Sequence, residues 1–315
     1  MQHFLGIDGG GTSTRAVLVD ASGRVLGTGE SGPSNYDNVG MVKAIEHIAE
    51  AAQFAKSADP SRVPDAVFLG CAGIKSASDI ARLTSAAETA GIGPAGEITT
   101  ANDLHNALTG GLAGQAGIAL IAGTGTNCLG RDVGGTTFMC GGWGWLLDDV
   151  GGGYGIAIAA MRSSVRSADR RSPKTRLLAA VLAFLGLSEP NEILARLYVE
   201  KWTADELAAF APVVMRLAAE GDVTALRILK EGAQALAELV VATARALSFP
   251  DAPSVVMLGG CALSGEPYQP MVESAIVRAL PDARIVPAFH SPAHGAALNA
   301  LRAGGIHPLP KLHIE

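Results

Sequence analysis

Apolar runs separated by polar turns predict the elements of the first third of the chain. The strands are expected at residues 4–8, 15–20, 25–31, 66–71 and 97–100, and the helices at residues 41–56, 78–90 and 104–112. The first three strands follow one another through short turns, and strands and helices then alternate. An antiparallel meander followed by such an alternation indicates an α/β unit with a mixed sheet.

The pattern starts again at residues 117–122, where an apolar run leads into the loop Gly123-Thr124-Gly125-Thr126 and a second strand-like stretch, residues 127–131. Residues 151–247 are mostly helical, with a break at 171–173 and an alanine-rich helix over 224–247. A strand over 254–258, which runs into the glycine pair at 259–260, and a helix over 292–303 complete the series. The recurrence predicts two related lobes around a cleft, one of residues 1–115 with 292–315 and one of residues 116–291.

The first strand ends in Asp8 and runs into Gly9-Gly10-Gly11, which Thr12, Ser13 and Thr14 follow. Glycine lets backbone N–H groups approach an oxyanion, and the hydroxyls are further donors. A P-loop would need a Lys-Ser/Thr pair, and a dinucleotide site would need a helix after the glycines. This loop joins two strands instead, which favours a different kind of phosphate site, although a turn without a ligand would carry the same glycines.

Two further positions allow both a chemical and a purely structural interpretation. Asp103 lies between a strand and a helix, where a carboxylate could accept a proton from a substrate hydroxyl or could complement the helix dipole. Gly259-Gly260 follows the strand over residues 254–258 and would suit adenine or ribose lying on bare backbone, but an ordinary turn explains it equally well.

The stretch over residues 140–155 holds seven glycines, Trp143, Trp145 and the adjacent carboxylates Asp148 and Asp149. Aromatic faces pack against the C–H face of a sugar ring, and carboxylates accept hydrogen bonds from its hydroxyls. The composition therefore favours a sugar site, although tryptophan is more often a core residue.

The composition of the chain limits the classes of partner that it could bind. Of 315 residues, 48% are hydrophobic and 17% charged, and the net charge is −6 without a basic block, which argues against nucleic acid or an anionic membrane. The four cysteines lie far apart and the seven histidines are scattered, so neither a disulfide framework nor a metal site built on cysteine or histidine is expected. Since we find no signal peptide and no apolar run of roughly 18 residues, we expect a cytoplasmic protein with a small-molecule ligand.

Taken together, the glycine sites, Asp8, Asp103 and the closing segment at residues 291–297 resemble the superfamily of sugar kinases, heat-shock protein 70 and actin. Within it the chain is similar to the BadF/BadG/BcrA/BcrD-type ATPases, over residues 5–301. The resemblance implies two ribonuclease H-like, actin-like ATPase lobes. One departure concerns the family's Gly-Asp-Glu-Gly motif, which here reads Asp148-Asp149-Val150-Gly151.

The resemblance also implies roles for individual residues. Asp103 would be the catalytic base, and Asp8 would orient Mg²⁺ through water. The expected contacts to ATP are Gly10, Gly11, Thr12, Ser13, Gly123, Thr124, Gly125, Gly259 and Gly260. The expected contacts to an amino sugar are Asn35, Asp103, Thr126, Asn127, Trp143, Gly144 and Asp149.

The implied activity is ATP- and Mg²⁺-dependent phosphorylation of an amino sugar, with the 6-hydroxyl of N-acetyl-D-glucosamine as the leading candidate. Glucosamine is an alternative acceptor, which the extra carboxylate of Asp148 would favour. An alternative of another class is an iron–sulfur ATPase that activates acyl-CoA dehydratases or aryl-CoA reductases, but no cysteine pair here has cluster spacing. The helical residues 151–247 could form a homodimer contact, and internal packing explains the same pattern.

Overall fold

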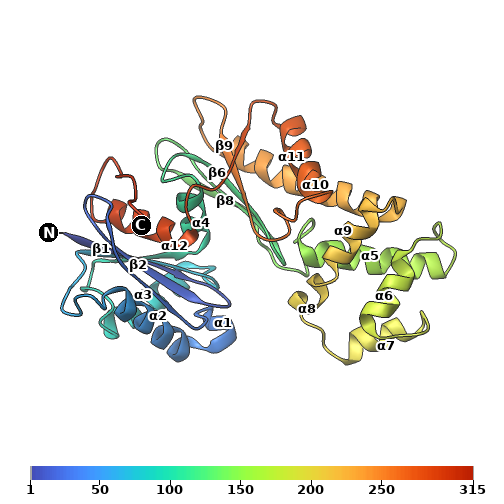
Figure 1. The fold of residues 1–315 in the computed structure, drawn as a ribbon, viewed down its shortest axis with the longest axis horizontal. Helices are drawn as coiled ribbons and strands as arrows, with labels where there is room; N and C mark the ends of the chain where they lie inside the picture. The colour runs from blue at the N-terminus through green and yellow to red at the C-terminus, as the bar shows by residue number, and fades with distance from the viewer. Residues whose placement is uncertain (1, 315) are drawn as a thin grey trace. The chain divides into compact units, whose positions relative to one another are not determined.

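The computed structural model describes residues 2–314. They form two compact units. Unit 1 consists of the residues up to Ala116 together with those from Pro287 onward, and unit 2 runs from Gly117 to Val286. Each unit is built on one five-stranded mixed sheet (Figure 1).

The sheet of unit 1 has the strand order β3-β2-β1-β4-β5. Its strands are β1 (His3–Gly9), β2 (Thr14–Asp20), β3 (Val25–Ser31), β4 (Ala66–Cys71) and β5 (Ile98–Asn102). The first three pair antiparallel, whereas β1, β4 and β5 run parallel. The predicted meander and alternation are therefore confirmed. The last strand reaches Asn102, two residues beyond its predicted end.

Helices cover both faces of this sheet: α1 (Tyr36–Val39), α2 (Met41–Ala55), α3 (Ala77–Thr89), α4 (Leu104–Gly111) and α12 (Pro292–Ala303). Leu5 and Ile7 pack with buried residues of α2 and α3, while Phe4 packs with buried residues of α12. Strand β1 and α12 approach so closely that a Cβ on Gly6 would lie 2.0 Å from the backbone nitrogen of Ala297. Glycine at this position is what permits the contact.

The sheet of unit 2 repeats the strand order and the pairing directions, as β10-β9-β6-β7-β8. Its strands are β6 (Gly117–Ala122), β7 (Thr126–Arg131), β8 (Thr137–Gly141), β9 (Ser254–Leu258) and β10 (Arg284–Val286). The recurrence in the sequence thus reflects a repeated topology. Both units have the fold expected of an actin-like ATPase.

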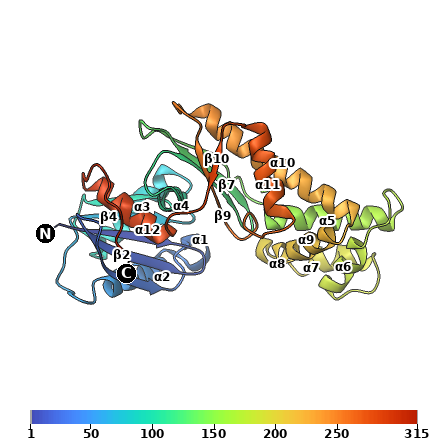
Figure 2. The same cartoon turned by 45° about the horizontal axis from the view of Figure 1, so that its top comes forward.

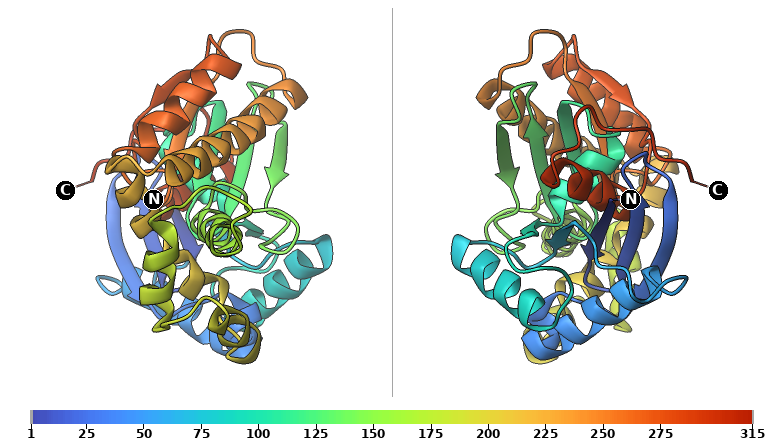
Figure 3. Two further views of the ribbon diagram at one scale, coloured as in Figure 1. Left: turned by 90° about the vertical axis from the view of Figure 1, so that its right-hand side faces the viewer. Right: turned by 90° about the vertical axis from the view of Figure 1, so that its left-hand side faces the viewer.

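The helices of unit 2 are α5 (Gly153–Ala168), α6 (Leu177–Leu185), α7 (Glu192–Val199), α8 (Ala204–Ala208), α9 (Ala211–Ala219), α10 (Val223–Ala246) and α11 (Tyr268–Ala279). The long helix α10 packs on the sheet and α11 lies beside it (Figure 3). Helices α5 to α9 form a helical group between β8 and α10 in the chain (Figure 2). The predicted break at residues 171–173 falls between α5 and α6.

Several elements differ from the sequence predictions. Four elements were not predicted from the sequence: β8, whose first three residues are exposed, the three-residue strand β10, and helices α1 and α11. The strand predicted before the glycine pair does end at Leu258, and Gly259 adopts a φ of 91° that a strand does not allow. Within residues 2–314, no helix combines the length and the apolarity that a membrane span requires.

Candidate active site

The glycine loop between β1 and β2 is tied to a second loop of unit 1. The backbone nitrogen of Gly10 donates to the Ser13 carbonyl at 2.9 Å, and the Gly10 carbonyl accepts from the nitrogens of Ser34 and Asn35 at 3.0 and 3.2 Å. Gly11 and Thr12 are exposed and Ser13 is half-buried. The loop therefore presents backbone and hydroxyl donors to solvent while its base is fixed.

The hydroxyl of Thr14 does not belong to this donor set. The residue is fully buried, and its Oγ1 donates to the Gly32 carbonyl at 2.7 Å and lies 2.8 Å from Ser34 Oγ. The sequence analysis counted Thr14 among the phosphate donors. The structure corrects this, because the hydroxyl instead joins β2 to the loop after β3.

Asp8, at the end of β1, is held from α4. Asn106 Nδ2 donates to Asp8 Oδ1 at 2.9 Å, and Gly70 leaves the space that the Asn106 side chain fills. Burial raises the pKa of Asp8, and the Asn106 hydrogen bond and the charge of Arg15 oppose this effect. The result is an oriented carboxylate in a partly desolvated position.

Asp103 occupies the N-cap position of α4, yet its side chain makes no capping hydrogen bond. Asn102 Oδ1 instead accepts from the nitrogen of Leu104 at 3.0 Å. Burial, and after it the negative charge of Asp8, raise the pKa of Asp103 to about 6, although the nearby backbone N–H groups of Asp103 and Leu104 act in the opposite direction. A carboxylate with this pKa is suited to proton transfer near neutral pH.

Asn35 is the N-cap of α1. Its Oδ1 accepts from the nitrogen of Asp37 at 3.1 Å, which orients the amide and leaves its Nδ2 as the donor for any further contact. Gly73 packs against Asn35, since a Cβ there would lie 2.7 Å from Asn35 Oδ1. The side chain is thus fixed by its helix and by a close neighbour.

In unit 2 the start of α5 holds the second glycine loop. The nitrogen of Gly153 donates to the Gly123 carbonyl at 2.8 Å, and that of Tyr154 donates to the Thr124 carbonyl at 3.0 Å. Within the loop, Gly123 donates to the Gly125 carbonyl at 3.0 Å. The loop is therefore rigid, and a helix N-terminus lies directly behind it.

Asp149 supports this loop from the other side. It is 7% exposed, and its Oδ1 accepts from the nitrogen of Thr126 at 2.7 Å. Burial raises the pKa of Asp149, although the Thr126 hydrogen bond acts in the opposite direction. A Cβ on Gly125 would lie 2.7 Å from the Asp149 carboxylate, so glycine is required at that position.

A cavity of about 260 Å³ lies beside Asp149 within unit 2. Its lining includes Gly125, Thr126, Asn127, Gly144 and Asp149.

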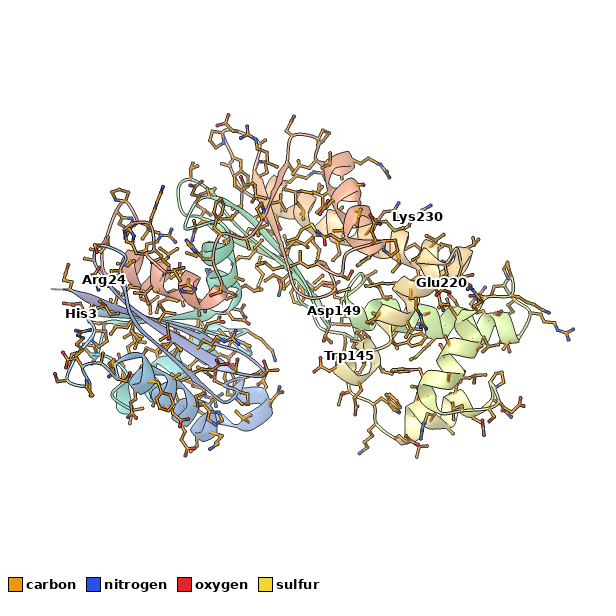
Figure 4. The ribbon with its side chains drawn as sticks, viewed as in Figure 1. His3, Arg24, Trp145, Asp149, Glu220 and Lys230 are labelled. Carbon is orange, nitrogen blue, oxygen red and sulfur yellow. The ribbon has the colours of Figure 1, made fainter. Side chains whose placement is uncertain are left out.

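The neighbouring tryptophans are exposed. Trp143 and Trp145 have 76% and 55% of their surface exposed, and the Trp145 ring meets Tyr154 edge to face at 5.6 Å. Trp145 and Asp149 both lie near the start of α5 (Figure 4). Exposure of two tryptophans on one short segment is unusual for a protein surface and fits a segment that contacts a ligand or partner.

A second cavity of unit 2, of about 330 Å³, connects the glycine loop to the helical group. Gly123, Thr124 and Gly260 line one side. The sequence analysis missed the other lining residues, among them Asp205, Ala208, Pro212, Met215 and Ser264. The pattern Thr203 to Glu206 signals a helix start, but no signal in the sequence indicates that this helix returns to a loop some 80 residues earlier.

The model of the BadF/BadG/BcrA/BcrD ATPase family matches residues 5–300. The chain belongs to this family. The chain is 31% identical to the N-acetylmuramic acid/N-acetylglucosamine kinase of Clostridium acetobutylicum, over 85% of this chain and 88% of that one. It is 30% identical to the N-acetyl-D-glucosamine kinase of Dictyostelium discoideum, over 95% and 98% of the two chains.

The fold of this family member is also similar to that of solved structures. A candidate N-acetylglucosamine kinase from Chromobacterium violaceum superposes with a TM-score of 0.71 at 25% identity, over 96% of this chain and 99% of that one. A glucokinase from Streptomyces griseus gives a TM-score of 0.57 at 20% identity, which supports the fold alone.

Proposed function

We propose that this member of the ATPase family is a kinase that transfers the γ-phosphoryl group of ATP to the 6-hydroxyl of N-acetyl-D-glucosamine. Two relatives that are 31% and 30% identical over most of the chain carry kinase names with this sugar. The observation that carries the proposal is the carboxylate of Asp103, which makes no side-chain capping hydrogen bond to its helix and has a pKa of about 6.

Asp103 would act as the general base. Its carboxylate accepts the proton of the sugar hydroxyl while the hydroxyl oxygen bonds to the γ-phosphorus and the bond from that phosphorus to the leaving ADP oxygen breaks. Most of the acceleration would come from positioning and from stabilisation of phosphate charge, as in other phosphoryl transfers.

Asp8 fits a role at a magnesium ion. Mg²⁺ prefers oxygen ligands and retains several waters, and Asp8 offers a carboxylate held in place by Asn106 and partly removed from solvent. When bound, the ion would neutralise phosphate charge. We expect the enzyme to act in the cytoplasm, where ATP is available as a substrate.

The remaining residues divide by ligand. For ATP we propose Gly10, Gly11, Thr12, Ser13, Gly123, Thr124, Gly125, Gly259 and Gly260. For the sugar we propose Asn35, Asp103, Thr126, Asn127, Trp143, Gly144 and Asp149. The fixed loops and the cavity beside Asp149 support this assignment.

Two other acceptors have specific support. The Vibrio cholerae glucosamine kinase GspK is 26% identical over 90% of this chain, and the Clostridium relative also carries N-acetylmuramic acid in its name. A coupled ADP assay over N-acetylglucosamine, glucosamine, N-acetylmuramic acid and glucose decides among them, with the phosphate position determined by NMR. We expect the highest kcat/KM for N-acetylglucosamine, and a higher value for glucosamine would reassign the substrate.

The Asp103→Asn variant tests the mechanism. Loss of a general base costs about 10²- to 10⁴-fold in kcat, while the KM for ATP should change little. Far-UV circular dichroism should confirm that the variant is folded. A folded variant with near-wild-type kcat would disprove the role of Asp103 as base.

A further inference from the structure

Asp205 makes a contact that its own helix does not explain. Thr124 Oγ1, in the glycine loop of unit 2, donates to Asp205 Oδ1 at 2.6 Å. The start of α8 is satisfied by other groups, because Thr203 and Glu206 form a reciprocal capping box. The Asp205 carboxylate is therefore directed at the loop, and the N-terminus of α8 does not need it as a cap.

The helix that carries Asp205 is fixed by packing. Leu207 of α8 is buried, as is Phe210 at the N-cap of α9, and the centroid of the Phe184 ring lies 5.0 Å from that of Phe210. Gly153 of α5 allows α8 to approach, since a Cβ there would lie 3.1 Å from Ala208 Cβ. Packed aromatic rings and a close helix contact thus hold α8 beside the loop, and the hydrogen bond from Thr124 directs the exposed Asp205 carboxylate to it.

Asp205 lines the 330 Å³ cavity at the point where its two kinds of wall meet. Thr124 lies on the side of the glycine loop, and Ala208, Pro212 and Met215 provide an apolar wall. An apolar wall suits a flat base, and the glycine loop suits phosphate. Among residues 2–314, no Lys, Arg or His forms an ion pair with Asp205.

An ionised carboxylate can only accept hydrogen bonds, and it repels phosphate. Its partner in a bound nucleotide must therefore be a neutral hydrogen-bond donor that lies between the phosphates and the base. The ribose hydroxyls are the groups that meet this description.

We propose that Asp205 selects ribonucleotides by accepting a hydrogen bond from a ribose hydroxyl. This inference rests on the proposed function, since it assumes that the cavity takes a nucleoside triphosphate. The Thr124 hydroxyl has a single proton, so while it donates to Asp205 it cannot donate to a phosphate. A ribose hydroxyl that replaces it at Asp205 releases the Thr124 proton for a phosphate oxygen.

The experiment compares nucleotides that lack one hydroxyl. Affinities for ADP, 2′-deoxy-ADP and 3′-deoxy-ADP are measured by calorimetry for the wild type and for Asp205→Ala. A hydrogen bond to a charged group corresponds to about 10- to 100-fold in affinity, so the wild type should bind one deoxynucleotide at least tenfold more weakly than ADP. Asp205→Ala should reduce this ratio to near one by weakening ADP and sparing the deoxynucleotide.

Asp169→Ala is the matched control, since Asp169 is an exposed carboxylate at the end of α5, outside the cavity, and should retain the wild-type ratio. Equal affinity of the wild type for all three nucleotides would overturn the inference. An equal loss for all three in Asp205→Ala would also overturn it. Because binding is measured without sugar, a failure of the proposed sugar kinase activity leaves these outcomes readable.

Discussion

At the scale of single residues, the most informative feature is that the adjacent side chains of Asn102 and Asp103 have different roles at the start of α4. Asn102 caps α4 through its Oδ1, and Asp103 beside it keeps its carboxylate out of that role. The sequence placed Asp103 at the start of a helix but left two roles open, because a carboxylate at that position normally serves the helix. Only the folded structure shows which of the two adjacent side chains accepts the hydrogen bond from the first turn of the helix.

The raised pKa of Asp103 predicts the acid limb of the pH profile. If the ionised carboxylate is the base, kcat/KM should fall about tenfold per pH unit below a pH of about 6. The measurement is the coupled assay with subsaturating N-acetylglucosamine from pH 4.5 to 8. Each acid-treated sample is assayed again at pH 7.5 to exclude denaturation, and a rate that stays constant down to pH 5 would contradict the assignment.

The same pKa predicts that Asp103 destabilises the fold when ionised. Its pKa is raised from 3.8 to about 6, so the folded state binds the proton more tightly than the unfolded state. The penalty is fully present above pH 6 and disappears as the pH falls below 3.8. Asp103→Asn should therefore raise the free energy of unfolding at pH 8 by up to about 3 kcal/mol, and by less at pH 5.

Urea unfolding at the two pH values measures this difference. Asp169→Asn serves as the control, because its carboxylate is half exposed at the surface of unit 2 and its replacement should change little at either pH. A variant of Asp103 that is equally or less stable than the wild type at pH 8 would show that the buried charge is compensated.

At the scale of elements, both glycine loops follow the central strand of a five-stranded sheet and turn into its antiparallel neighbour. The sequence predicts this arrangement well, because apolar strands and glycine-hydroxyl turns are local patterns. It does not predict the supports of the loops. Asp149 and the start of α5 reach Gly125 and Gly123 from more than 20 residues away, and such contacts leave no periodic signal.

Two glycines of one loop should therefore respond differently to alanine. At Gly125 the new methyl group would collide with the Asp149 carboxylate at 2.7 Å, whereas at Gly123 it would meet nothing within 4 Å. Gly125→Ala should lower the free energy of unfolding by about 1–3 kcal/mol and weaken binding of N-acetylglucosamine. Gly123→Ala should stay within about 0.5 kcal/mol of the wild type.

Chemical denaturation and calorimetric titration of the sugar compare the two variants. If Gly125→Ala is as stable as Gly123→Ala and retains the sugar affinity, Asp149 does not hold the loop in the manner described.

At the scale of the whole molecule, the two units have the same sheet topology but different continuity in the chain. Unit 2 is one segment, and unit 1 combines the residues up to Ala116 with those from Pro287 onward. The repeated strand, loop and strand pattern made the two-unit architecture predictable. The edge strands β8 and β10 were not, because one is largely exposed and the other has three residues.

Removal of residues 287–315 should unfold unit 1. Helix α12 buries Ala297, Leu298 and Leu301 against Phe4 and its neighbours. The burial free energy lost with several such side chains is as large as the free energy of unfolding of an ordinary domain. Hydrogen exchange should show protection lost in β1 and β2 and kept in β6 and β9. A chain that ends at residue 305 retains α12 and is the control, and protection of β1 in the shorter chain would contradict the expectation.

This discontinuity bears on how the chain emerges during synthesis. Gly6 of β1 is synthesised before all of unit 2, whereas its partner Ala297 is synthesised after all of unit 2. Unit 2 is complete in sequence as soon as Val286 has left the ribosome, while the sheet of unit 1 still lacks the helix that covers one of its faces. The first unit to be synthesised is thus the last that can be finished, and its apolar face must stay protected until then.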